Sequence, residues 1–132
     1  MQSVETDAFF IKFRKGFSME GHRRYIRIPE NFEISYSLIS AKEVPTACTT
    51  MDISEGGVRF PANNFIPKDS RLKIKIVLSK TSILIEVLVR VTRVEKAAYG
   101  DSYEIAAEFI DMSRRDAAFL GNCIKEYLRT RE

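Results

Sequence analysis

Two consecutive runs of alternating apolar and polar residues constrain the fold of this chain more than any other feature. Successive side chains of a β-strand point to opposite faces, so an apolar residue at every second position makes one face apolar. The apolar positions are Leu72, Ile74, Ile76 and Leu78 in the first run, and Ile83, Ile85, Val87, Val89 and Val91 in the second. A break near Lys80 and Thr81 separates the runs. The pattern therefore predicts two long strands joined as a hairpin.

Shorter runs predict further strands on either side of this hairpin. They occupy residues 32–38, 44–53, 58–60 and 103–109. Turn-forming residues separate the runs, at Ser54-Glu55-Gly56-Gly57 and again at Tyr99-Gly100-Asp101. Many short strands with turns between them, and no interposed helices, are typical of an antiparallel barrel. We expect six strands.

The last part of the chain has a different period. Ser113 followed by Asp116 has the spacing of a helix N-terminal capping box, and apolar residues then recur at helical spacing from Leu120 to Leu128. One amphipathic helix over about residues 113–130 is predicted, with its apolar stripe packed on the sheet. The expected fold class is thus all-β with one C-terminal helix: a six-stranded antiparallel β-barrel closed by that helix.

Length and composition exclude several classes of protein. A chain of 132 residues fits one domain, and 45% hydrophobic with 30% charged residues is ordinary for a globular protein. There is no run of about 20 apolar residues, and Glu5 and Asp7 stand where a signal peptide would carry basic residues. We therefore expect a cytoplasmic protein without membrane insertion. Two cysteines and one histidine make no recognisable metal cluster, so no metal is expected.

Residues 1–21 alternate poorly, and we interpret them as an N-terminal arm or switch segment, separate from a barrel domain over residues 22–132. The arm contains four phenylalanines, which need a surface to cover them: Phe9, Phe10, Phe13 and Phe17. That surface is this barrel, a second copy of the chain in a homodimer, or another protein.

Two clusters interrupt the plain β pattern: the basic run His22-Arg23-Arg24-Tyr25-Ile26-Arg27, and the turn region from Asp52 to Arg59. In this order and spacing they resemble the paired signature of the PilZ domain family, R-x-x-x-R followed some 20 to 30 residues later by [D/N]-x-S-x-x-G. The residues that match are Arg23 and Arg27 in the first motif, and Asp52, Ser54 and Gly57 in the second. The resemblance covers about residues 21–130 and implies a PilZ-type barrel that binds the second messenger cyclic di-GMP.

The residue types suit that ligand. The planar guanidinium group of arginine meets the O6 and N7 acceptors of guanine with two hydrogen bonds, and it also pairs with phosphate. Asp52 supplies a carboxylate acceptor for guanine N1–H and N2–H, and Ser54 bonds the ligand or braces the turn. Gly57, and Gly56 beside it, allow backbone to approach closely. Arg59, Arg24 and His22 are further candidates for the ligand-binding set, on the outer face or at the pocket mouth.

The expected function is therefore a cyclic di-GMP receptor or adaptor, without a cofactor, that moves its N-terminal arm on ligand binding and signals to an unidentified effector protein. The main alternative is a degenerate PilZ-like protein–protein adaptor that binds no nucleotide. Binding of single-stranded nucleic acid is disfavoured, because the barrel aromatics mostly lie in the inward register. Catalysis is not expected, because no trio of nucleophile, base and orienting group can be assembled.

Overall fold

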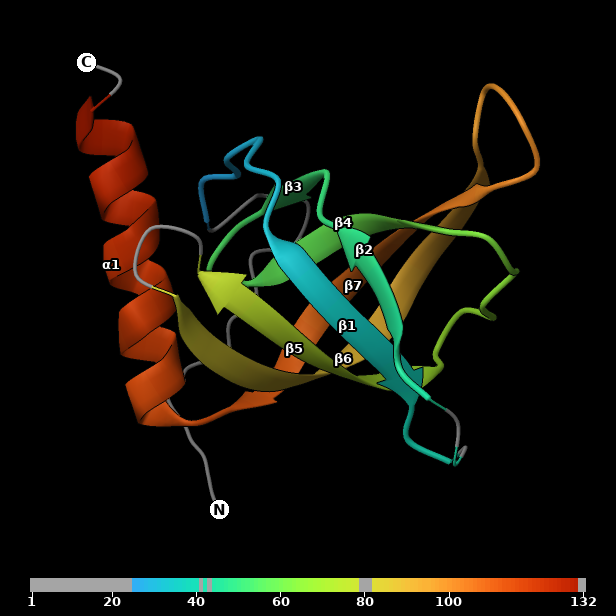
Figure 1. Cartoon of the computed structure of the whole chain (residues 1–132), viewed down its shortest axis with the longest axis horizontal. Coiled ribbons are helices and arrows are strands. Elements are labelled where there is room, and N and C mark those ends of the chain that lie inside the picture. Colours follow the sequence, from blue (N-terminus) through green and yellow to red (C-terminus); the bar gives the residue numbers. More distant parts are fainter. Residues whose placement is uncertain (1–24, 41, 43, 79–81, 131–132) are drawn as a thin grey trace.

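The computed structural model describes residues 25–40, 42, 44–78 and 82–130. These residues form an antiparallel sheet of seven strands and one helix (Figure 1). The elements are β1 (Glu33–Leu38), β2 (Thr46–Thr49), β3 (Asp52–Ile53), β4 (Gly57–Ala62), β5 (Arg71–Leu78), β6 (Ile83–Lys96), β7 (Tyr103–Met112) and α1 (Arg114–Thr130). The order of the strands in the sheet is β2-β1-β5-β6-β7-β4-β3.

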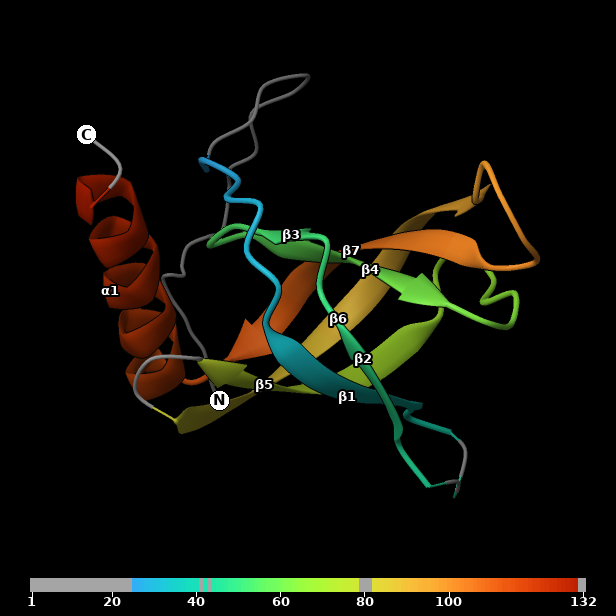
Figure 2. The same ribbon diagram turned by 45° about the horizontal axis from the view of Figure 1, so that its top comes forward.

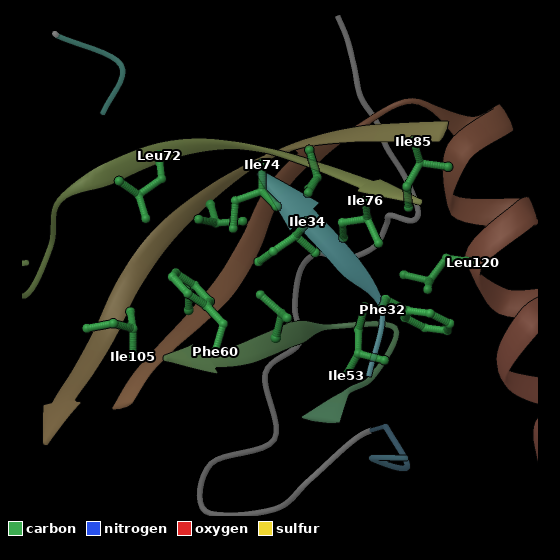
Figure 3. Close-up of a cluster of buried hydrophobic side chains, with 14 of the residues drawn as sticks. Phe32, Ile34, Ile53, Phe60, Leu72, Ile74, Ile76, Ile85, Ile105 and Leu120 are labelled. Atoms are coloured by element: carbon green, nitrogen blue, oxygen red, sulfur yellow. The ribbon is translucent and has the colours of Figure 1, made fainter. Parts of the chain in front are cut away.

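The period-two pattern correctly predicted which side chains form the core. The apolar residues of β5 and β6 that alternate with charged ones are buried on the concave face, and those of β4 and β7 meet them from the other side (Figure 3). Phe32 and Phe60 are among the largest fully buried side chains. Cys48 is half-buried against this core, and burial raises the pKa of its thiol to about 11.

The expectation of six strands was wrong, because the run from Val44 to Ile53 forms two strands, β2 and β3. The chain changes partners between them at Thr50 and Met51. The Thr50 amide donates to Phe32 O at 2.9 Å, whereas the Met51 amide donates to Arg59 O at 2.7 Å. The buried Thr50 hydroxyl accepts from the Phe32 amide at 2.9 Å and donates to Glu30 O at 2.7 Å, and these bonds stabilise the change of partner. Such contacts between distant residues leave no mark on local periodicity.

This change of partners also curls the sheet. β2 pairs with β1 at one edge and β3 pairs with β4 at the other, yet the two edge strands are consecutive in the chain. The link at Thr50 and Met51 therefore brings the two edges together, as the two views show (Figures 1 and 2). The barrel-like curl that was expected from the sequence results from this link.

Helix α1 begins as the capping spacing predicted. The Asp116 amide donates to Ser113 Oγ at 3.0 Å. The buried Asp116 carboxylate accepts from the Glu86 amide at 3.0 Å, so it ties the first turn of the helix to β6 instead of reaching back to the cap. Leu120 and Ile124 then bury the apolar face of the helix in the core.

Two further turns and the absence of a membrane-spanning segment were also expected from the sequence. The turn at 99–101 is present, and Gly100 has a left-handed φ of 78°. The predicted break near Lys80 and Thr81 lies outside the described residues. None of the helices among the described residues is long and apolar enough to cross a membrane.

Candidate functional site

Asp52 lies on β3, directly across from Arg59 on β4 in the antiparallel register. Both side chains point to the outer face, because Ile53 and Val58 beside them are fully buried. Arg59 Nε donates to Asp52 Oδ2 at 2.9 Å, and Arg59 Nη2 lies 2.8 Å from the same oxygen. The short strand pair β3–β4 therefore places a carboxylate and a guanidinium group side by side at the surface.

Arg27 reaches the same carboxylate from a segment 25 residues earlier in the chain. Its Nη1 donates to Asp52 Oδ1 at 2.8 Å. Ile28 and Ile53 exchange two backbone hydrogen bonds, Ile28 N to Ile53 O at 2.9 Å and Ile53 N to Ile28 O at 3.0 Å. The segment after residue 24 thus lies beside β3, which both views of the ribbon show (Figures 1 and 2). The second arginine of R-x-x-x-R and the aspartate of the second motif are in direct contact.

A fourth charged residue completes what we call the Asp52 cluster. Arg59 Nη1 donates to Glu104 Oε1 of β7 at 3.0 Å. Asp52 is the least exposed member, with 13% of its side chain accessible against 34% for Arg27. The hydrogen bond to Asp52 raises the pKa of Arg59, more than partial burial lowers it. The cluster consists of Arg27, Asp52, Arg59 and Glu104.

Ser54 braces the turn that follows Asp52. Its Oγ accepts from the amides of Gly56 at 3.0 Å and Gly57 at 3.1 Å, and its own amide donates to Gly57 O at 2.9 Å. The residue is 4% exposed. Two roles were expected for Ser54, binding the ligand or bracing the turn, and these hydrogen bonds brace the turn.

The two glycines of the turn each have a different close neighbour. A Cβ on Gly57 would lie 2.6 Å from the carbonyl oxygen of Ala107 on β7, so the bare Cα lets β4 and β7 pair closely. A Cβ on Gly56 would lie 2.5 Å from Cδ2 of the Tyr25 ring. Neither glycine has a positive φ, so close approach and not backbone conformation requires a glycine here.

Sequence reasoning assigned no role to Glu104 and Tyr25, which both contact these residues. Glu104 lies beside Arg59 because of the register between β4 and β7, which the alternation within one strand does not give. The candidates His22, Arg23 and Arg24 lie outside the described residues. Within the part of the chain that the structure describes, no three His, Cys, Asp or Glu side chains gather as metal ligands.

Solved structures of low sequence identity share this fold. The inhibitor of motility of Bacillus subtilis (MotI/DgrA) matches with a TM-score of 0.70 and 19% identity, over 84% of this chain and 54% of that one. The PilZ domain of YcgR from Escherichia coli, solved with cyclic di-GMP, matches with a TM-score of 0.63 and 17% identity, over 82% and 92%. The cyclic di-GMP complex of MrkH from K. pneumonia matches with a TM-score of 0.66 and 17% identity, over 83% and 53%.

This chain thus spans about half the length of the Bacillus and MrkH proteins and nearly all of the YcgR domain. No curated protein matches the sequence. The family model described as PilZ domain matches residues 21–127, which include the strands, most of the helix and both signature motifs. The chain belongs to the PilZ domain family.

Proposed function

We propose that this chain is a receptor for cyclic di-GMP and binds the ligand at the Asp52 cluster. The observation that carries the proposal is the 2.8 Å contact between Arg27 Nη1 and Asp52 Oδ1, which unites the two signature motifs at one place on the surface. The solved structures of the YcgR domain and of MrkH with cyclic di-GMP support it, because both share the fold.

In this proposal one guanine of the ligand has its two edges bound by opposite charges. Arg23 and Arg27 bind O6, N7 and the phosphates, because guanidinium groups supply paired donors in one plane. Asp52 accepts from guanine N1–H and N2–H. Arg59 adds a cationic surface for stacking, and Arg24 and His22 contribute at the pocket mouth. Ser54, Gly56 and Gly57 give the turn its shape below the nucleotide.

The existing contacts of the cluster leave room for this exchange. Asp52 Oδ2 already has two nitrogens of Arg59 within 2.9 Å, but among the described residues Oδ1 accepts only from Arg27, so its second lone pair accepts a further hydrogen bond. Partly exposed ion pairs are worth only about 0–1 kcal/mol, so replacing Asp52 by a phosphate as the partner of an arginine costs little. The ligand therefore joins or replaces contacts that the cluster has already arranged.

The proposed output is a change in the N-terminal arm. Arg23 and Arg27 connect residues 1–21 to the barrel domain of residues 22–132, so a ligand that binds both arginines favours one position of the arm. The new position of the arm exposes or hides a surface to which an effector protein binds. That partner is another protein or a second copy of this chain. A cytoplasmic location and signalling without catalysis are part of the same proposal.

Calorimetric titration of the chain with cyclic di-GMP tests the proposal and gives the stoichiometry. Binding is expected for the parent, and Arg27→Ala should weaken it by about tenfold to more than a hundredfold. Arg90→Ala is the matched control, since Arg90 is 33% exposed and also pairs with carboxylates, but on another part of the sheet. A parent chain that does not bind would favour the nucleotide-free adaptor, and an Arg27→Ala protein that binds normally would remove Arg27 from the site.

A further inference from the structure

Tyr25 lies between the two arginines of the signature and contacts the turn that carries the second motif. An added Cβ on Gly56 would lie 2.5 Å from Cδ2 and 2.7 Å from Cε2 of the Tyr25 ring. Such distances are shorter than carbon–carbon contact allows, so the edge of the ring already packs on the bare Cα of Gly56. The glycine is therefore matched to the aromatic side chain above it.

Among the described residues, this packing accompanies two other attachments between the arginine segment and the second motif. They are the Arg27–Asp52 ion pair and the pair of backbone hydrogen bonds between Ile28 and Ile53. The ion pair is partly exposed and contributes little by itself. The bridge is anchored by the Ile28 side chain, which is 1% exposed and lies in the core. Tyr25, three residues earlier, packs on the turn and supplies a second apolar contact, which holds the N-terminal end of the segment.

We propose that Tyr25 is a positioning residue, which seats its ring on Gly56 and so holds the arginine segment in register on the acidic turn. In this position Arg27 meets Asp52. The consequence for affinity rests on the function proposed above, but the seating of the segment does not. Gly56 acts as the receiving surface for the ring, whereas Gly57 serves the pairing of β4 with β7.

Hydrogen exchange of the Ile28 and Ile53 amides tests the seating directly, because both amides bond across the contact. Tyr25→Ala removes the ring and Gly56→Ala places a methyl group in its position. Each change should speed exchange of these two amides by about tenfold, while the buried amide of Val89 stays protected. Ile26→Ala is the control from the same segment, since Ile26 is 63% exposed, and it should leave exchange within about twofold of the parent.

Two further variants separate positioning from general damage. Tyr25→Phe keeps the ring and should exchange like the parent. In the double variant of Tyr25→Ala with Gly56→Ala, the added methyl group has no ring to displace, so exchange should be no faster than in Tyr25→Ala alone. Additive effects in the double variant, or loss of protection in Tyr25→Phe, would overturn the proposal. Unchanged exchange at Ile28 in Tyr25→Ala would overturn it as well.

Titration of the same variants with cyclic di-GMP connects the seating to ligand binding. Tyr25→Ala and Gly56→Ala should each bind about three- to tenfold more weakly, with Tyr25→Phe close to the parent, because the ligand must first restore the position of Arg27. A parent that binds no cyclic di-GMP would refute the proposed function and leave the exchange result as the test of Tyr25. Normal affinity in Tyr25→Ala, with fast exchange, would refute the role in binding.

Discussion

Two arginines on the outer face of the sheet, Arg59 and Arg90, have nearly the same surroundings. In each case Nε and Nη2 share one carboxylate oxygen, at 2.9 and 2.8 Å for Arg59 and at 2.9 and 2.7 Å for Arg90, while Nη1 bonds a second carboxylate. Both side chains are 33% exposed. Hydrogen bonding to a carboxylate raises the pKa of both. The group around the second arginine, which we call the Arg90 cluster, consists of Asp69, Arg90 and Glu108.

The two clusters differ in the carboxylate at their centre. Asp52 is 13% exposed and binds a second arginine, Arg27, from a distant segment, whereas Asp69 is 66% exposed and Glu108 45%. The Arg90 cluster has the geometry of an ordinary surface network. An arginine held by two carboxylates is therefore not by itself a ligand site. The half-buried carboxylate, the second arginine and the braced turn beside them distinguish the Asp52 cluster.

The largest expected effect on affinity comes from neutralising Asp52, and the same change at Asp69 of the Arg90 cluster is its control. Asp52→Asn weakens the hydrogen bonds that Asp52 accepts from two arginines and from guanine, so affinity for cyclic di-GMP should fall by about a hundredfold. Asp69→Asn makes the same chemical change in the Arg90 cluster and should leave affinity within about twofold. Calorimetry on both variants measures the difference. Equal losses would show that overall charge, and not the place where the motifs meet, controls binding.

A second substitution tests how tightly β4 packs on β7 between the two clusters. Gly57 pairs with Glu108 of the Arg90 cluster, and an added Cβ would collide with the Ala107 carbonyl, which belongs to the backbone and cannot rotate away. Gly57→Ala should therefore lower the free energy of unfolding by about 1–3 kcal/mol, as overpacking does in other proteins. Denaturant titration measures this value.

Gly56→Ala is the matched control for that substitution. The three atoms nearest to its new methyl group belong to the Tyr25 side chain, which can rotate where a backbone carbonyl cannot, so the loss of unfolding free energy should be smaller than for Gly57→Ala. Should the two variants be equally stable, the contact between β4 and β7 at Ala107 would not be a tight one.

The strands were predictable from the sequence wherever one face is buried. Alternation from Leu72 to Val91 identified the central hairpin and its core residues, because each strand there has one apolar face. The change of partners at Thr50 was not predictable, since it depends on hydrogen bonds to Glu30 and Phe32, some 20 residues away. Local patterns report which face is buried, but they do not report which neighbour a short strand will choose.

The same distinction applies to the site. Arg27, Asp52 and Ser54 were identified because they belong to motifs that are contiguous in the sequence, and the described residues bring all three into one small region. Glu104 and Tyr25 belong to no motif. Glu104 comes to Arg59 through strand register, and Tyr25 comes to Gly56 through packing, so neither contact can be inferred without the three-dimensional structure.

The smallest effect is expected from the carboxylate that β7 contributes to each cluster, Glu104 or Glu108. Glu104→Gln keeps a hydrogen-bond acceptor for Arg59 Nη1 but removes the charge, which roughly halves the strength of that bond. Arg59 is then less firmly oriented, and affinity for cyclic di-GMP should fall by about three- to tenfold. Glu108→Gln makes the same change beside Arg90 and should alter affinity by less than about twofold. If both variants weaken binding alike, the contact between Glu104 and Arg59 has no special role in binding, because the loss of either charge on β7 would then have the same effect.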